Sequence, residues 1–196
     1  YLVEEGTPGF KKGAPLQKLG VHSQDTAELF FSNCRVPKEN RLGEKGTGFM
    51  ILMEKLQQER LLVAILANTM AAFALDWTIE SLRTQKTSNG SGQLSQSVRF
   101  ALVEMSTEIK LGRTFLEKLI SDHMEGRDIV SETSMVKFWN TEMANRVVGG
   151  CLELCGEMAM SESCPVVRTF RDVRVTPIFA GTNEIMKSIV AKNMKL

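Results

Sequence analysis

The chain has 196 residues, 43% apolar and 24% charged, which suffices for one ample domain or for one domain with part of another. Its net charge of +1 predicts no attraction to nucleic acid or to an anionic membrane surface. The longest apolar run, residues 61–75, is too short and too mixed for a transmembrane helix, so no membrane span is predicted. Four cysteines and two histidines without a C-x-x-C pair favour free thiols in a reducing compartment over a disulfide framework or a zinc site.

The N-terminal part differs in composition from the rest of the chain. Residues 1–42 hold most of the early glycines and prolines, and the run AELFFSNCRV predicts two or three β-strands. From about residue 46 the pattern becomes helical. The predicted helices cover residues 50–85, 93–126, 130–158, 168–172 and 183–195. Ser131 is the candidate N-cap of the third helix, residues 85–92 are expected to form a polar loop, and residues 173–181 are expected to be extended. Three long antiparallel helices and a shorter one predict a helical bundle.

The first long helix carries an acidic residue, Glu59, within an apolar stripe at helical spacing formed by Leu52, Leu56, Val63, Leu66 and Met70. A carboxylate on an apolar face is costly unless it is paired, protonated or used. Glu59 either pairs with Lys55 four residues earlier, or lies where the stripe meets solvent, or is a general base with a raised pKa in an apolar cleft. The spacing leaves these alternatives open.

Three segments together resemble the acyl-CoA dehydrogenase family: QDTAELFFSNCRVPKENRLGEKGTGF (24–49), LQQERLLVA (56–64) and RDVRVTPIFAGTNEIM (171–186). The resemblance covers essentially the whole chain but only the C-terminal part of a family member. It implies a mainly α fold class, in which residues 1–42 are the end of a middle β-domain and residues 43–196 are the C-terminal four-helix-bundle domain. The chain is therefore expected to be a fragment that is inactive by itself.

The resemblance implies an FAD-dependent oxidation of an acyl-CoA thioester to trans-2-enoyl-CoA. In such enzymes a carboxylate removes the α-proton while the β-hydrogen leaves as hydride. In the long-chain and isovaleryl branches the base lies in a Q-E-R segment, which corresponds here to Glu59 and Arg60, whereas other branches place it where this chain has Ala180. The resemblance therefore implies Glu59 as the base and the backbone N–H of Ala180 as a donor to the thioester carbonyl. The expected substrate-lining residues are Met50, Gln57, Gln58, Arg60, Ala180 and Gly181.

One expected FAD segment is well matched. Thr182, Asn183 and Glu184 correspond closely to the family pattern, and they open the last predicted helix, whose N-terminal N–H groups could face the cofactor. Without the resemblance, Thr182 and Glu184 have the pattern of a plain helix N-cap.

Two further FAD segments depart from the family pattern. The first, R-x-x-F-G with a later Gln, is represented by Gln85, Ser88 and Asn89 and keeps only the later amide, Gln96. The second, Q-L-H-G-G-x-G-Y, is represented by ELCGEMAM (153–160). There Gly156 remains, but Glu153 and Glu157 introduce carboxylates that would repel a pyrophosphate.

The resemblance also implies partners and a compartment. These are an acyl-CoA substrate, an electron-transferring flavoprotein as electron acceptor and a second copy of the chain, in a dimer or a dimer of dimers. The compartment would be the mitochondrial matrix in a eukaryote and the cytoplasm in a bacterium. The departures favour an alternative, a divergent member with weakened FAD binding that serves as a non-catalytic acyl-CoA-binding or interaction module. An acyl-CoA oxidase is another alternative, whereas an unrelated all-α bundle leaves the segment RVTPIFAGTNEIM unexplained.

Overall fold

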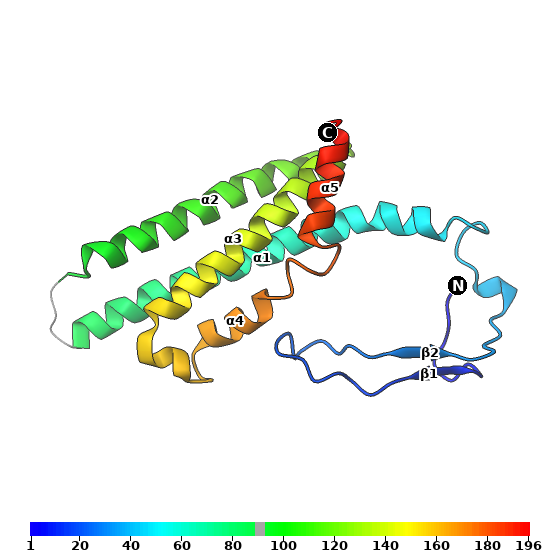
Figure 1. Ribbon diagram of the computed structural model, residues 1–196, viewed down its shortest axis with the longest axis horizontal. Coiled ribbons are helices and arrows are strands. Elements are labelled where there is room, and N and C mark those ends of the chain that lie inside the picture. Colours follow the sequence, from blue (N-terminus) through cyan, green and yellow to red (C-terminus); the bar gives the residue numbers. More distant parts are fainter. Residues whose placement is uncertain (89–92) are drawn as a thin grey trace. The chain divides into compact units, whose positions relative to one another are not determined.

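The protein is mainly helical, which confirms the predicted fold class. The computed structural model describes the backbone of residues 1–88 and 93–196 and the side chains of residues 1–85 and 93–196. Its described elements include five α-helices and two short β-strands (Figure 1). Contacts divide the chain into two compact units, Tyr1–Leu56 and Gln57–Leu196.

The first unit contains a two-stranded antiparallel sheet. Strand β1 (Phe10–Lys12) pairs with β2 (Leu29–Phe31), so that Phe10 lies opposite Phe31. The two rings stack with their centroids 4.9 Å apart, which supports this short pairing. A 3₁₀ helix, η1 (Lys38–Asn40), follows.

Three long helices and three shorter ones follow. They are α1 (Gly48–Ser88), α2 (Gln96–Met124), α3 (Val130–Leu154), the 3₁₀ helix η2 (Gly156–Met160), α4 (Pro165–Val173) and α5 (Asn183–Asn193). Local sequence explains where several of them begin. The hydroxyl of Ser95 accepts the backbone N–H of Val98 at 3.3 Å and caps α2, and Pro165 occupies the first turn of α4.

Three local predictions are wrong. Residues 85–88, expected to belong to a polar loop, are the last residues of α1, and residues 89–92 of that loop lie outside the described part of the chain. Ser131 lies inside α3, whose N-cap is Ile129, and the carboxylate of Asp128 accepts the N–H of Val130 at 3.2 Å instead. Residues 174–180 form consecutive turns and are not extended. The β-branched residues of 173–181 suggested a strand, but Val173 is the buried last residue of α4, and Thr176 is 1% exposed with its hydroxyl donating to the Val173 carbonyl at 2.8 Å. Tertiary packing has overridden a weak local preference.

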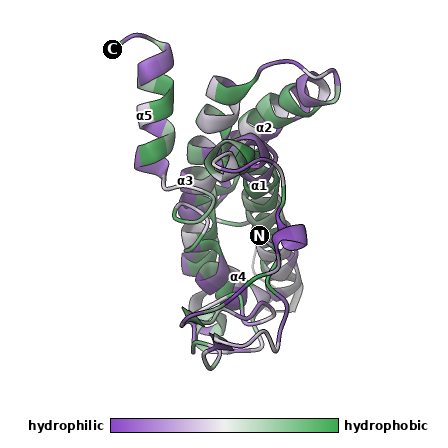
Figure 2. Cartoon of the chain, turned by 90° about the vertical axis from the view of Figure 1, so that its right-hand side faces the viewer, coloured by the Kyte–Doolittle hydropathy of each residue, from purple (hydrophilic) through white to green (hydrophobic). Residues whose placement is uncertain are grey.

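Helix α3 lies at the centre of the second unit, where it contacts α2, α4, α5 and η2. Hydrophobic stretches occur in all the long helices (Figure 2). Part of the core-facing surface of α1 is made of small residues, since Ala64, Ala67, Ala71 and Ala74 are each 0% exposed, whereas Leu61 and Leu75 bury larger side chains. At the alanine positions the backbone of α1 can approach its neighbours closely.

The apolar stripe predicted for α1 is therefore assigned to the wrong face. Val63 is buried, but Leu52 and Leu66 are 54% and 46% exposed. The buried face instead includes Arg60 and the alanines. Apolar residues occur all around α1, so their spacing could not identify which face enters the core.

Helix α1 bears on the prediction that the chain has no membrane span. Its segment Gly48–Gln85 is long and apolar enough to cross a membrane by length and composition alone. Yet 44% of its most apolar stretch is buried inside the structure, and the core helix of a globular domain passes the same test. One such helix is weak evidence for a span.

A polar contact joins the three long helices inside the core. Asn68 of α1 donates to the carbonyl of Ile109 in α2 at 3.1 Å, and Asn140 of α3 donates to the carbonyl of Ala64 at 3.5 Å. Both amides lie against Gly112 of α2. A Cβ atom at Gly112 would stand 2.1 Å from Oδ1 of Asn140, so the glycine is required for this close approach.

We expect Gly112→Ala to destabilise the protein by about 1–3 kcal/mol, because the overlap with Asn140 forces the helices apart. Gly149→Ala in α3 is the matched control, since a Cβ there meets no atom within 4 Å. The control should stabilise α3 by up to about 1 kcal/mol through helix propensity. Urea unfolding of both variants measures these changes, and equal midpoints for the two would contradict the packing described for Gly112.

Candidate functional site

The candidate site is built on the turn that precedes α5. Ala180 and Gly181 both have positive φ angles, 55° and 99°. This backbone conformation costs an alanine roughly 1–2 kcal/mol, so the surrounding structure must hold it. Space is also tight, because a Cβ at Gly181 would stand 2.9 Å from Cε of Met186. Thr182 then caps α5, and its hydroxyl accepts the N–H of Ile185 at 3.5 Å.

Two buried cations hold the carbonyl groups of this turn. Arg60 of α1 is 5% exposed and donates from Nε to the carbonyl of Ala180 at 3.3 Å. Lys137 of α3 is 0% exposed and donates from Nζ to the carbonyl of Gly181 at 2.7 Å. Consecutive carbonyls are therefore bound by side chains from two different helices.

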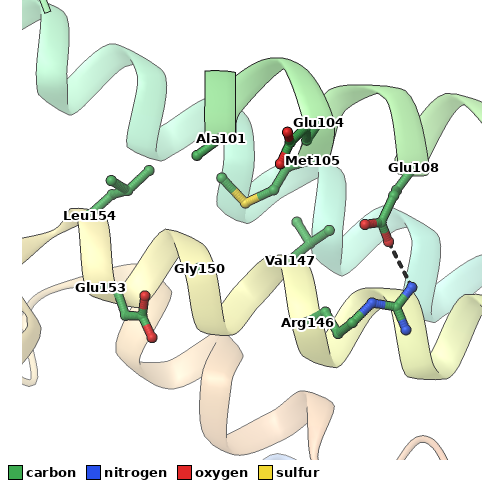
Figure 3. A pocket seen from close by; sticks show the side chains of 9 residues that line it. All are labelled: Ala101, Glu104, Met105, Glu108, Arg146, Val147, Gly150, Glu153 and Leu154. Atoms are coloured by element: carbon green, nitrogen blue, oxygen red, sulfur yellow. Dashed lines mark hydrogen bonds and ion pairs between the residues drawn. The ribbon is translucent and has the colours of Figure 1, made fainter. Parts of the chain in front are cut away.

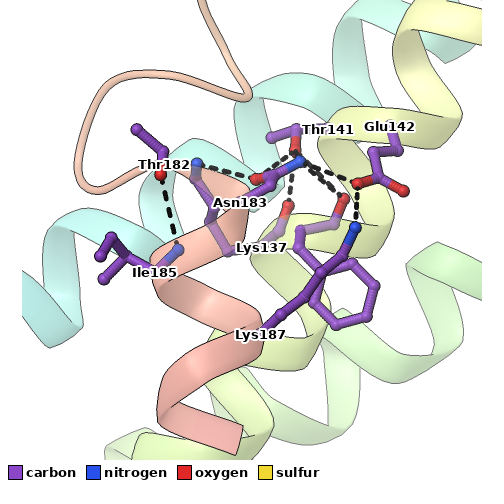
Figure 4. Close-up of polar contacts among 8 residues, drawn as sticks. Lys137, Thr141, Glu142, Thr182, Asn183, Ile185 and Lys187 are labelled. Carbon is purple, nitrogen blue, oxygen red and sulfur yellow. Dashed lines mark hydrogen bonds and ion pairs between the residues drawn. The ribbon is translucent and has the colours of Figure 1, made fainter.

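Asn183 anchors the start of α5 to α3. It is 3% exposed, and its Oδ1 accepts from Nζ of Lys137 at 3.0 Å (Figure 4). Its Nδ2 donates to the hydroxyl of Thr141 at 3.0 Å and lies 3.4 Å from Oε1 of Glu142. These contacts occupy both ends of the side-chain amide, and the backbone N–H of Asn183 donates to the carbonyl of Pro177 at 3.0 Å. A cofactor contact by Asn183 stays a prediction.

Burial and neighbouring charges set the protonation of this cluster. The pKa of Lys137 is lowered to about 8, first by burial and then by the positive charge of Arg60, whereas Glu184 acts to raise it. Burial also lowers the pKa of Arg60. At the start of α5, the pKa of the exposed Glu184 carboxyl is lowered by a backbone hydrogen bond and by the Thr182 hydroxyl.

Glu59 lies immediately before Arg60 on α1, so its backbone is adjacent to the residue that binds the turn. Its side chain is exposed, and within the described chain it has no ion-pair partner. Lys55 pairs with Glu54 at 3.2 Å, so the predicted alternative of a Lys55–Glu59 pair is wrong. The position is one where the helix meets solvent, whereas its use as a base stays a prediction.

The expected substrate-lining residues have different environments. Arg60, Ala180 and Gly181 are brought together by the contacts described above. The carbonyl oxygen Oε1 of Gln57 is buried and has no hydrogen-bond partner among the described residues. Gln58 is exposed, and Met50 is 69% exposed.

The two segments that differ from the family's FAD pattern lie near the C-terminal end of α3. Gln85 donates from Nε2 to Sδ of Met158 at 3.5 Å, which brings the end of α1 next to η2. Gly156 has a φ of 55° with open space around it, and Glu157 is exposed. Gln96 is exposed at the first turn of α2. Asn89 and the side chain of Ser88 lie outside what the structure describes.

Glu153 lines a groove of about 220 Å³ between α2 and α3 (Figure 3). Glu104 and Glu108 line the same groove, where Arg146 donates to Glu108 at 2.7 Å. Sixteen residues separate Lys137 from Glu153 along α3, which corresponds to roughly 24 Å. The turn before α5 and the Glu153 segment therefore occupy different ends of the helix.

Sequence reasoning missed Lys137 and Thr141. Both lie in the buried stripe of α3 with Ala144 and Val148, at spacings of four, three and four residues. The argument applied to Glu59, a charged residue within an apolar stripe, would have singled out Lys137.

The lowered pKa of Lys137 predicts a pH dependence of stability. The folded protein binds this proton less tightly than the unfolded chain, so unfolding takes up a proton above about pH 8. The free energy of unfolding of the wild type, minus that of Lys137→Met, should therefore increase as the pH rises from about 8 toward 10. Urea titrations across this range measure the difference, and a difference independent of pH would contradict the burial of this ammonium.

Comparison with known proteins identifies the chain. A family model described as "Acyl-CoA dehydrogenase, C-terminal domain" matches residues 46–195. The long-chain specific acyl-CoA dehydrogenase of Sus scrofa mitochondria is 39% identical over 194 residues, covering 99% of this chain and 45% of that protein.

Solved structures agree. An acyl-CoA dehydrogenase from Geobacillus kaustophilus has a TM-score of 0.92 at 46% identity, covering 99% of this chain and 51% of that one. Butyryl-CoA dehydrogenase from Megasphaera elsdenii has a TM-score of 0.88 at 32% identity, with coverages of 99% and 51%. The chain thus spans about half the length of the proteins that it matches. It belongs to the acyl-CoA dehydrogenase family and corresponds to the C-terminal portion of its members.

Proposed function

We propose that the chain is the C-terminal part of an FAD-dependent acyl-CoA dehydrogenase that converts an acyl-CoA thioester to trans-2-enoyl-CoA. The observation that carries this proposal is the hydrogen bond from Arg60 to Ala180, which joins the Q-E-R segment to the turn across 120 positions of sequence. Activity is assigned to the full-length protein, meaning this chain with any further residues that its gene encodes.

Glu59 is the proposed base for the α-proton of the thioester. That proton is weakly acidic, so its removal also requires hydrogen-bond donors that stabilise the negative charge developing on the thioester oxygen. The backbone N–H groups of Ala180, Gly181 and Thr182 have no acceptor within the described chain and are available for this role. Their position next to Arg60, and hence next to residue 59, supports the assignment.

Because Glu59 is exposed, its proposed role as base requires that it be shielded from water when the substrate is bound. A carboxylate surrounded by water is a weak base for such a proton, because solvation stabilises its charged form. The proposal therefore expects Glu59 to be shielded in the full-length protein when the substrate is bound. Met50, Gln57, Gln58 and Gly181 are the other proposed substrate contacts.

The start of α5 fits an anionic cofactor such as FAD. Free N–H groups at a helix N-terminus favour negative charge, and Arg60 and Lys137 add positive charge behind them. A side chain at Gly181 would contact Met186 and Arg60, so the glycine keeps the turn close to Arg60. We propose that Thr182 contributes its backbone N–H here, that Asn183 and Glu184 belong to the same FAD-binding segment, and that bound FAD supplies the hydride acceptor.

A second candidate function rests on the other end of α3. Glu153 and Glu157 are exposed, and neither has an ion-pair partner within the described chain. If the FAD pyrophosphate lies there, as the resemblance implies for Gln96 and Gly156, these carboxylates would weaken its binding. A divergent family member that binds acyl-CoA without catalysis is the alternative that this observation favours.

The partners and the compartment are proposed from the family resemblance. The family resemblance suggests an electron-transferring flavoprotein as electron acceptor and a dimer or a dimer of dimers as the assembly. The mitochondrial matrix in a eukaryote, or the cytoplasm in a bacterium, is the compartment that this function would require.

Flavin content distinguishes the two functions. The purified full-length protein should be yellow, and its flavin absorbance should bleach when acyl-CoA is added without oxygen, because the substrate reduces the cofactor. Colourless protein that takes up no added FAD would instead support the non-catalytic alternative. Absorbance spectra before and after anaerobic addition of a long-chain acyl-CoA provide the measurement.

Replacement of the base provides a residue-level test. Glu59→Gln keeps the size of the side chain but cannot accept the α-proton, so kcat should fall by about 100- to 10,000-fold. Glu117→Gln is the matched control, since Glu117 is an exposed glutamate that pairs with Arg113 on the outside of α2. Turnover of Glu59→Gln within twofold of the control would assign the base to another residue.

A further inference from the structure

Lys137 is the largest side chain that the structure buries completely. A buried ammonium is costly unless hydrogen bonds or an opposite charge compensate for the lost water. Its hydrogen-bond acceptors are the neutral oxygens of Gly181 and Asn183, and no carboxylate lies within ion-pairing distance in the described chain. Arg60 adds a second positive charge nearby. The folded protein therefore buries the Lys137 ammonium although its desolvation costs free energy.

Anchoring of α5 does not by itself account for Lys137. Asn183 already connects α5 to α3 through the hydroxyl of Thr141 and the carbonyl of Phe138. An apolar side chain of similar length would fill the same volume at a lower desolvation cost. What such a side chain could not supply is the hydrogen bond to the Gly181 carbonyl.

This hydrogen bond sets the direction of the next N–H group. In a planar trans peptide, the C=O of one residue and the N–H of the following residue point in opposite directions. Because the Gly181 carbonyl points to Lys137, the N–H of Thr182 points away from α3. By the same geometry, the contact between Arg60 and the Ala180 carbonyl directs the N–H of Gly181 away from Arg60.

We propose that Lys137 is a positioning residue that holds the Gly181–Thr182 peptide in a left-handed turn and so aims the unpaired N–H groups of the turn at the ligand. It touches neither the acyl group nor the reacting atoms. The inference rests on the proposed dehydrogenase function, since it assigns those N–H groups to substrate and cofactor. Arg60 orients the preceding peptide, and the two cations together fix an orientation that Ala180 does not adopt readily.

The test uses Lys137→Met, which keeps length and volume but removes the donor, and Lys137→Gln, which restores a neutral donor. Lys110→Met on the exposed side of α2 is the control. In the full-length protein, Lys137→Met should lower kcat by about 10- to 100-fold while the KM for acyl-CoA changes less than threefold, because the donors are misaligned. Lys137→Gln should recover part of this loss, and the control should match the wild type.

A second measurement does not depend on activity. Hydrogen–deuterium exchange of a peptide covering residues 178–186 should be faster in Lys137→Met than in the control, while peptides from α2 remain unchanged. Unchanged exchange in this peptide, together with kcat within twofold of the control, would overturn the proposal. A loss of stability with normal kcat would also overturn it, since that result indicates a purely structural lysine.

The two measurements separate this inference from the proposed function. A full-length wild type without dehydrogenase activity would contradict the function, and the exchange experiment would then decide the role of Lys137. If Lys137→Met does not fold, Lys137→Leu, which also lacks the donor, replaces it: slower turnover with faster exchange at residues 178–186 supports positioning, and wild-type values for both contradict it.

Discussion

The hydrogen bond between the Lys137 ammonium and the Gly181 carbonyl constrains the whole C-terminal end of the protein. It requires α3 to present a charged residue in its buried stripe and α5 to begin at one particular place. In the same turn, Ala180 and Gly181 have positive φ angles. Arg60 reaches the same turn from α1, so segments of sequence far apart converge on two adjacent peptide groups.

The two ends of α3 differ in electrostatic character. The end near the turn combines two buried cations with the N-terminus of α5, an arrangement that favours negative charge. The other end presents Glu153 and Glu157 to solvent next to the contact between Gln85 and Met158. One helix thus separates a region suited to anions from a region that opposes them. Any account of cofactor binding by this family member has to treat the ends separately.

The helices were predictable because proline, glycine and polar stretches interrupt otherwise continuous helical patterns. The resemblance indicated the family. It also indicated that the base lies either at the position of Glu59 or at that of Ala180, depending on the branch of the family. The core face of α1 could not be predicted, since apolar residues surround that helix. The turns at residues 174–180 were missed because β-branched residues favour strands locally, whereas Val173 ends α4 here and Thr176 is buried in the turns that follow. Lys137 could be singled out as a charged residue in the apolar stripe of α3, but its acceptors at Gly181 and Asn183 are distant in sequence and could not be predicted.

The alanine face of α1 limits how the sequence can vary. Ala64, Ala67, Ala71 and Ala74 contribute only methyl groups to the core, so these four positions have no side-chain volume to give up to a neighbour. A larger residue at any of them requires a neighbouring residue to become smaller. The opposite face, which includes Leu62, Leu66 and Phe73, is exposed and free of that restriction. Among related chains, divergence should accumulate on this outward side of α1, while the inward side retains small residues.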